Sequence, residues 1–299
     1  MRLPGSTDPT VAFATSATVA DVTDDDLLLA RELEAAGMRV EPAVWDSPAL
    51  EWKRYAAVVV RSTWDYHLRH EAFMAWVGHL EHLGVPVLNP PRLMRWNADK
   101  HYLMDLAAHG VPVVPTRWVR QHDAASLAQI MEEAHWEHVV VKPAVSASAH
   151  RTWRASVSEA PLLEENFRAL VATGSALVQP FVEAVTTDGE WSLLFYGGTY
   201  SHSVLKRPRH DDFRVQREHG GTSAPSEPSL DVVDDARLAL RTAERARGVS
   251  LYARVDGCVL DGRFVLMELE LIEPDLFLRS HPEAPGRLAR SLLSMLHRG

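Results

Sequence analysis

Two carboxylates inside an apolar, strand-like segment limit how the C-terminal part of this chain can fold. Residues 264–276 read FVLMELELIEPDL, so Glu268 and Glu270 interrupt an otherwise apolar run. Carboxylates are rarely buried without a partner. The preceding segment, LYARVDGCVL at 251–260, is followed by an Asp-Gly turn signal. The two segments are therefore predicted to form a β-hairpin.

The register of this hairpin decides which side chains share a face, because a slip of one residue moves every side chain to the other face. A two-residue turn would mix charged and apolar residues on both faces. A three-residue turn at 261–263 leaves one face wholly apolar, so we predict that register. It places Asp256 opposite Glu268 and Arg254 opposite Glu270.

The charged face of the hairpin is a candidate metal site, because Asp256, Glu268 and Glu270 converge on it. Glu268 and Glu270 would lie ~7 Å apart along the strand, close enough to flank a cation. Oxygen ligands suit Mg²⁺, which usually binds together with substrate phosphates, and Mn²⁺ fits the same set. The alternative is a solvated sheet face with a surface pair of Arg254 and Glu270.

The first third of the chain alternates between strand-like and helix-like segments. Short apolar runs at 10–15, 56–60 and 85–89 alternate with helical patterns at 24–36 and 69–83. This βαβα order predicts a small parallel sheet with flanking helices.

The remainder carries further helices, short strands and two hairpins. Helices are predicted at 98–109, 124–134, 229–247 and from about 284, strands at 117–119, 139–143 and 176–183, and hairpins at 190–206 and 251–271. The expected fold class is α/β and α+β. We place an N-terminal domain at 1–97, a central lobe at 98–182 and a C-terminal lobe at 183–299.

Composition argues against several functional classes. The net charge of -9 argues against a nucleic-acid partner. No apolar run approaches the ~20 residues that span a bilayer, and the N-terminus lacks the pattern of a secretory signal. The single cysteine, Cys258, allows no intrachain disulfide. We therefore expect a cytoplasmic protein without a membrane partner.

Lysine is rare in this chain. The 31 basic residues include only Lys53, Lys100, Lys142 and Lys206 as lysines. Because arginine serves almost everywhere else, a lysine that remains is a hint that a compact ammonium is needed. Lys142 ends the apolar segment VVVKP and Lys100 opens a predicted helix, so both could bind phosphate oxygens. The alternatives are that Lys142 reaches solvent and that Lys100 pairs with Asp99.

The order of these features resembles the ATP-grasp superfamily. The features are Lys100, VVVKP, the small-residue loop AVSASAH, LVQPFVE, and RVD followed by MELE, and they cover residues ~85 to 275. The nucleotide-binding patterns GxxxxGK[ST] and GxGxxG are absent. The resemblance implies a two-lobed ATP-grasp module behind an N-terminal parallel-sheet domain, with ATP between the lobes.

The resemblance also implies roles for individual residues. The residues implied to bind ATP are Lys100 and Lys142 at the phosphates, Gln179, Phe181 and Val182 near the adenine, and Glu190 at the ribose or the substrate. Asp256, Glu268 and Glu270 would hold Mg²⁺. Family members commonly have asparagine where Glu270 stands, and a glycine in the phosphate-covering loop where this chain has AVSASAH.

The implied reaction is ligation. ATP would phosphorylate a substrate carboxylate, and a nitrogen nucleophile would attack the acyl phosphate to form a C–N bond. Arg254 is the catalytic candidate, because it shares a face with the metal ligands and could stabilise the charge that develops. In length and order the chain also resembles the cyclo-ligases that convert O-ureido-D-serine to D-cycloserine. A ligase that joins two amino-acid or peptide substrates, a non-catalytic nucleotide-binding protein and a metal-dependent hydrolase are the alternatives.

Candidate substrate contacts come from two loops and one strand. Ser62, Trp64 and Asp65 follow an apolar strand, and ligands of open α/β sheets bind beyond the carboxyl ends of strands. Arg214 and Lys206 could hold a substrate carboxylate. An ordinary polar loop and a surface strand are the alternatives. We expect a small amino-acid-like substrate and leave the number of metal ions and the oligomeric state, including a homodimer, open.

Overall fold

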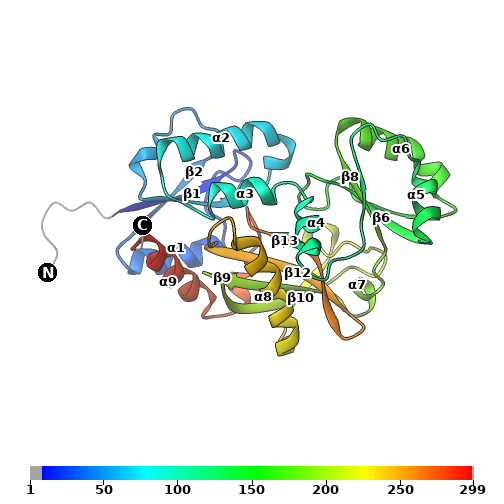
Figure 1. Cartoon of the computed structure of the whole chain (residues 1–299). Coiled ribbons are helices and arrows are strands. Elements are labelled where there is room, and N and C mark those ends of the chain that lie inside the picture. Colours follow the sequence, from blue (N-terminus) through cyan, green and yellow to red (C-terminus); the bar gives the residue numbers. More distant parts are fainter. Residues whose placement is uncertain (1–8, 298–299) are drawn as a thin grey trace, which may run out of the picture.

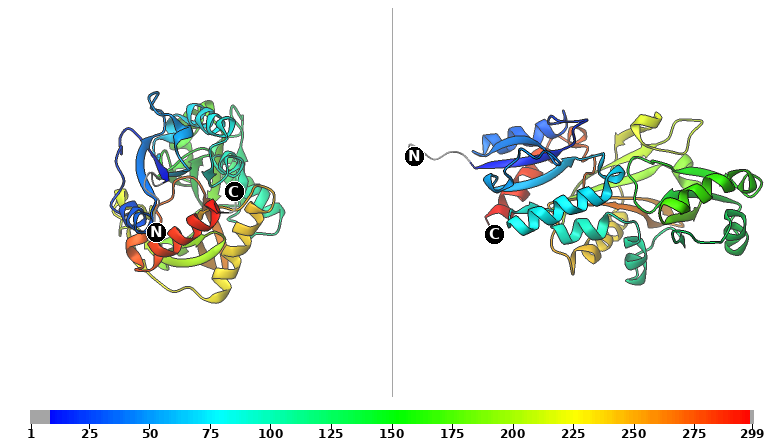
Figure 2. Two further views of the ribbon diagram at one scale, coloured as in Figure 1. Left: turned by 90° about the vertical axis from the view of Figure 1, so that its left-hand side faces the viewer. Right: turned by 90° about the horizontal axis from the view of Figure 1, so that it is seen from above.

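In the computed structural model, which describes residues 9–297, the chain forms three β-sheets with helices packed around them (Figure 1). The N-terminal sheet lies at one end of the molecule and the central sheet at the other, with the C-terminal sheet between them (Figures 1 and 2). This architecture confirms the predicted mixture of a parallel-sheet domain and α+β lobes. No helix among residues 9–297 is long and apolar enough to cross a membrane.

The N-terminal sheet is parallel, with the strand order β2-β1-β3-β4. Its strands are β1 (Thr10–Thr15), β2 (Arg39–Val44), β3 (Ala57–Ser62) and β4 (Val87–Leu88), and its helices are α1 (Asp26–Ala35), α2 (His70–Leu83) and α3 (Pro91–Asn97). The sequence did not predict β2. This strand lies at the sheet edge and contains Pro42, a residue that only an edge strand or a bulge tolerates.

The central sheet has the order β5-β8-β6-β7 and is antiparallel. Its elements are β5 (Arg117–Val119), α5 (Leu127–Ala134), β6 (His138–Pro143), β7 (Trp153–Ser156), α6 (Ala160–Thr173) and β8 (Ala176–Pro180). Buried residues of both helices form one apolar core with the strands. Strand β7 was not predicted, because it follows directly on the small-residue loop.

The C-terminal sheet has the order β11-β10-β9-β12-β13. Its strands are β9 (Glu190–Tyr196), β10 (Thr199–Arg207), β11 (Thr222–Pro225), β12 (Tyr252–Leu260) and β13 (Arg263–Glu270), and the helices around it are α4 (Tyr102–Ala108), α7 (Ala184–Thr187), α8 (Leu230–Glu244) and α9 (Ala284–Leu296). α4 and α8 share one core with this sheet. α9 lies beside α1 of the N-terminal domain (Figure 1). The boundaries at 97 and 182 stay a prediction.

The predicted helix at 98–109 is wrong at its start. α3 ends at Asn97 and α4 begins at Tyr102, so Lys100 lies in the turn between two helices. The side chain of Asn97 donates to the carbonyl of Leu269 at 2.7 Å and accepts from the amide of Leu271 at 2.9 Å. These two hydrogen bonds satisfy backbone groups at the end of the edge strand β13 and just after it. The turn carries Lys100 toward the same strand.

The β12–β13 hairpin corrects the predicted turn and the pairing next to it, and keeps the predicted pairing of the charged residues. Leu260 pairs with Arg263, so the turn has two residues, Asp261 and Gly262, with φ values of 50° and 78°. Both positive values are typical of a type I′ turn. The register then shifts between Asp256 and Gly257. This bulge restores the pairs Asp256–Glu268 and Arg254–Glu270.

Gly257 makes the bulge sterically feasible. A Cβ atom at this position would lie 2.3 Å from the carbonyl oxygen of Val265 and 2.6 Å from the Phe264 ring. We expect Gly257→Ala to lower the free energy of unfolding by about 2 kcal/mol or more, because the backbone must shift to admit the methyl group. Denaturant unfolding measures this. Gly174→Ala is the control, since its Cβ would meet nothing within 4 Å, and equal stability of the two variants would contradict the steric account.

Candidate active site

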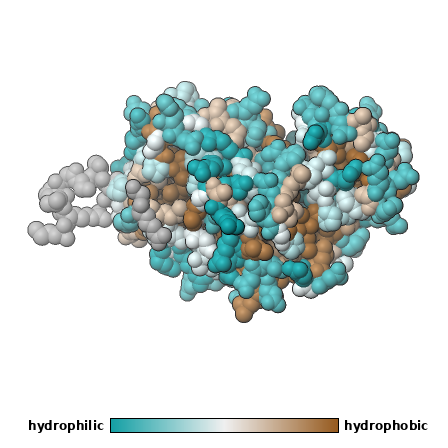
Figure 3. Space-filling view, viewed as in Figure 1, coloured by the Kyte–Doolittle hydropathy of each residue, from teal (hydrophilic) through white to brown (hydrophobic). Residues whose placement is uncertain are grey.

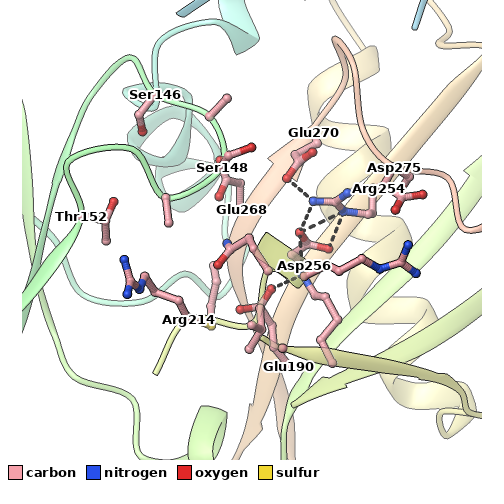
Figure 4. A pocket seen from close by; sticks show the side chains of 18 of the residues that line it. Ser146, Ser148, Thr152, Glu190, Arg214, Arg254, Asp256, Glu268, Glu270 and Asp275 are labelled. Carbon is pink, nitrogen blue, oxygen red and sulfur yellow. Dashed lines mark hydrogen bonds and ion pairs between the residues drawn. The ribbon is translucent and has the colours of Figure 1, made fainter. Parts of the chain in front are cut away.

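A cavity of about 870 Å³ lies where the three sheets meet. Trp64 follows β3 of the N-terminal sheet, Lys142 lies on β6 of the central sheet, and Asp256 and Glu268 lie on β12 and β13. Ser146, Ser148 and Thr152 line one side of the cavity, across from Asp256 and Glu270 of the C-terminal sheet (Figure 4). The outer surface seen in Figure 3 is mostly hydrophilic, with scattered apolar patches.

A chain of ion pairs crosses the floor of the cavity. Lys206 Nζ lies 2.5 Å from Glu190 Oε1 and 3.3 Å from Asp256 Oδ2. Arg254 Nη2 lies 3.0 Å from Asp256 Oδ2 and also pairs with Glu270 (Figure 4). β9, β10, β12 and β13 are neighbours in the sheet, so their alternating side chains place all five charges on one face.

Burial raises the pKa of the carboxyl groups in the cavity, whereas neighbouring cations lower it. Burial alone would raise the pKa of Asp256, but Arg254 and Lys206 outweigh it and hold this pKa below its ordinary value. Ser192 also donates to Asp256 at 2.6 Å. Burial raises the pKa of Glu270 to about 7 against the opposing effect of Arg254. Asp256 is therefore a fixed anion, whereas Glu270 can gain or lose a proton near neutral pH.

The two lysines predicted to bind phosphates both line the cavity. Lys100 Nζ donates to the carbonyl of Ser146 at 2.8 Å and lies 2.9 Å from Glu268 Oε1, so it does not pair with Asp99. Lys142 is half-buried, and within residues 9–297 it forms no hydrogen bond or ion pair through its ammonium. Burial lowers the pKa of Lys142. A bound anion would compensate this cost.

Most of the other predicted site residues meet in the same cavity. The lining residues among them are Gln179, Phe181, Val182, Glu190, Lys206, Arg214, Arg254 and Trp64. Gln179 Nε2 donates to Thr116 at 2.8 Å, and Arg214 is held by Asp212 at 2.8 Å. Ser62 and Asp65 do not line the cavity. Ser62 is buried, and Asp65 accepts from Trp45 Nε1 at 3.1 Å.

Further lining residues come from the end of β3, the loop after it and the segment after β13. Arg61 belongs to the segment RSTWDYH (61–67), which the sequence indicates as a candidate substrate pocket; it lies one residue before the end of β3, is 4% exposed and pairs with Asp26 at 2.7 Å. Tyr66 follows in the same loop. Glu273 lines the cavity from the segment after β13, where the alternation of side chains along the strand no longer applies. A charged residue at the end of an apolar strand was the available signal for Arg61.

The titration of Glu273 gives a stability test. Burial and then Glu270 raise the pKa of this carboxyl from the ordinary 4.5 to about 8. The folded protein thus binds the proton of Glu273 more tightly than the unfolded chain does. The stability that this proton contributes is full below pH 4.5 and is lost as the pH rises through 8. In Glu273→Gln this loss is absent. The melting temperature of the variant minus that of wild type should rise by a few degrees from about pH 5 to about pH 8.5. A difference that does not change with pH would contradict the shift.

Comparison with known proteins shows the family to which this chain belongs. A family model described as the D-cycloserine synthetase DcsG, N-terminal domain, matches residues 11–89. The cycloserine biosynthesis protein DcsG of Streptomyces lavendulae is 32% identical over 304 residues, which cover 96% of this chain and 98% of that protein. The chain belongs to the DcsG family. It is therefore an ATP-dependent ligase, as the sequence resemblance implied.

Solved structures agree with membership of the DcsG family. The crystal structure of D-cycloserine synthetase DcsG matches with a TM-score of 0.87 and 28% identity, over 96% of this chain and 99% of that one. D-alanine–D-alanine ligase from Bacillus anthracis matches with a TM-score of 0.69 and 14% identity, over 98% of both chains. The second match concerns the fold alone. Together they confirm the ATP-grasp fold of this DcsG-family chain.

Proposed function

We propose that this chain is the cyclo-ligase that converts O-ureido-D-serine to D-cycloserine with ATP. The match to DcsG carries this proposal, because it runs through the N-terminal domain and both lobes. The substrate comes from the sequence resemblance, and the cavity supports it. Cationic groups for phosphates and an arginine for a reacting carboxylate line one space of about 870 Å³.

The proposed reaction has two steps. A carboxylate oxygen of the substrate takes the terminal phosphoryl group of ATP, and ADP leaves. A nitrogen of the same molecule then attacks the acyl carbon, so that a C–N bond forms, the C–O bond to phosphate breaks, and the nitrogen loses its proton. D-cycloserine lacks the carbamoyl group of O-ureido-D-serine. The balanced reaction therefore also consumes water and releases ammonia and carbon dioxide.

The residues act in this scheme by positioning and by charge. Lys100 and Lys142 would neutralise the phosphates, while Phe181 and Val182 would contact the adenine. Arg254 would stabilise negative charge on the acyl phosphate and on the tetrahedral intermediate. Because it already pairs with Asp256 and Glu270, its guanidinium is held in place before the substrate binds.

Mg²⁺ fits part of the predicted ligand set. The side chains of Glu268 and Glu270 are 31% and 26% exposed and face the cavity, whereas that of Asp256 is 3% exposed and bonded on both oxygens. Within residues 9–297 no three His, Cys, Asp or Glu residues form a ready metal site. We propose that Glu268 and Glu270 hold Mg²⁺, or Mn²⁺, together with phosphate oxygens. Asp256 would join them after it releases Lys206. The ion would neutralise charge on the transferred phosphoryl group.

Lys142→Arg should weaken nucleotide binding, although the chain uses arginine almost everywhere else. The planar guanidinium is too bulky to replace a compact ammonium between phosphate oxygens at the end of a buried strand. We expect the Kd for ATP, measured by calorimetry, to rise about tenfold. Lys53→Arg is the matched control, since Lys53 lies outside the cavity. Unchanged ATP affinity in Lys142→Arg would show that this lysine only reaches solvent.

The release of ADP and ammonia with O-ureido-D-serine tests the proposed function. Both should appear in equal amounts, with ATP and Mg²⁺ present and without any second amine. A ligase that joins two molecules would need that amine and would release no ammonia. No ADP with O-ureido-D-serine alone would overturn the cyclo-ligase proposal. The predictions of a homodimer and of a cytoplasmic location stay predictions.

A further inference from the structure

The segment between β13 and the short 3₁₀ helix η4 (Leu278–Ser280) places Glu273 in the wall of the cavity. Glu273 is half-buried. Within residues 9–297 its carboxylate makes no hydrogen bond or ion pair with another residue; its own backbone amide bonds to it, and the charges of Glu270, Lys100 and Arg254 act on it from a greater distance. A carboxylate that is partly removed from water without a partner is costly. This position therefore indicates a cationic group on the ligand.

The other carboxylates of the cavity differ from Glu273. Those that are buried or half-buried have cationic partners: Asp25 with Arg279, Asp26 with Arg61, Glu190 with Lys206, Asp256 with Lys206 and Arg254, Glu268 with Lys100, and Glu270 with Arg254. Asp24, Glu218 and Asp275 also line the cavity but are exposed, so water solvates them. Of the lining carboxylates in residues 9–297, Glu273 alone is both partly buried and without a cationic partner.

The surroundings of Glu273 place it beside the proposed site of reaction. Arg254 Nη1 donates to the carbonyl of Asp275, two residues after Glu273, at 3.2 Å, and Figure 4 shows Asp275 next to Arg254. On the other side, Trp64 Nε1 donates to the backbone carbonyl of Glu273 at 3.3 Å. Glu273 thus lies between the catalytic candidate and the loop after β3, on the side of the N-terminal domain.

An α-amino acid carries its carboxylate and its ammonium on the same carbon, so the protein groups that contact the two must be neighbours. Arg254 is placed for the carboxylate that reacts. We propose that Glu273 binds the α-ammonium of the substrate and so makes the cavity selective for α-amino acids, an inference that rests on the proposed function. Glu270 and burial disfavour the ionised form of Glu273 in the free protein. A bound ammonium would restore it.

The test pairs a protein change with a substrate change. Wild type and Glu273→Gln are each given O-ureido-D-serine and its desamino analogue, in which hydrogen replaces the amino group. Kd is measured by calorimetry with Mg²⁺ and a non-hydrolysable ATP analogue, and KM and kcat are measured from ADP release. We expect wild type to bind the analogue about 30-fold more weakly than the amino acid, as for a lost charged hydrogen bond. Glu273→Gln should bind both compounds equally within about threefold, because the two changes remove the same contact.

Glu165→Gln removes the same charge from an exposed position on α6 and should keep the ratio of wild type. The inference is overturned if Glu273→Gln also keeps that ratio, or if wild type does not distinguish the two compounds. It is equally overturned if the variant loses affinity for both compounds alike and added Mg²⁺ restores it, since Glu273 would then be a metal ligand. The Kd values decide the inference even if wild type releases no ADP with O-ureido-D-serine. A lack of ADP release would count against the proposed function alone.

Discussion

Glu268→Gln is expected to lower ATP turnover by at least about 100-fold while the protein stays folded. The amide keeps the shape of the side chain and an acceptor for Lys100, so the fold loses little. It cannot offset the charge of Mg²⁺ beside phosphates. Because this side chain is 31% exposed toward the cavity, the expected change in melting temperature is small.

Asp256→Asn should lose activity to the same extent but behave differently in stability. Asp256 bonds Ser192, Lys206 and Arg254 at a buried position, so the amide leaves two buried cations with less compensation. ADP release and thermal unfolding, measured on both variants beside Glu165→Gln, separate the two effects. Turnover of Glu268→Gln above about a tenth of wild type, or ~1.4 kcal/mol of barrier, would remove this residue from the reaction.

Arg254→Ala should lower kcat far more than it raises KM. Arg254 shares a face with the proposed metal ligands, and its charge is best used on the acyl phosphate and the tetrahedral intermediate rather than on the bound substrate. A loss of about 100-fold in kcat is the scale for removal of one such donor. Arg254→Lys keeps the charge near Asp256 and Glu270. It reports whether the guanidinium geometry matters beyond the charge.

Arg214→Ala provides the contrast. Arg214 comes from a loop and is held by Asp212, so it should contribute mainly to binding of the ground state. Its replacement should raise KM and change kcat less. If the two arginine variants show the same pattern of KM and kcat, the division of roles between them is wrong.

Much of the site could be predicted from the sequence, because every second residue of a strand points to the same face of the sheet. Arg254, Asp256, Glu268 and Glu270 meet as predicted, although the turn that was used to derive their pairing is wrong. Counting from the two-residue turn alone would shift the pairing of Asp256 by one residue, and the bulge beside Gly257 restores its pairing with Glu268. A bulge depends on the close approach of the Val265 carbonyl, a tertiary contact without a periodic signal.

The contacts that the sequence could not supply come from segments without regular structure. Glu273 follows the end of β13, where the alternation of side chains along a strand no longer predicts their direction. The edge strand β2 was hidden by Pro42. Ion-pair partners such as Lys100 with Glu268 are 168 positions apart in the numbering, so only the packed fold brings them together.

The central claim is that a carboxylate of the substrate is activated as an acyl phosphate before the ring closes. O-ureido-D-serine labelled with ¹⁸O in its carboxylate tests this step directly. The account predicts that one labelled oxygen appears in the released inorganic phosphate and that the other stays in D-cycloserine, both observed by mass spectrometry. Unlabelled phosphate released together with D-cycloserine would contradict it.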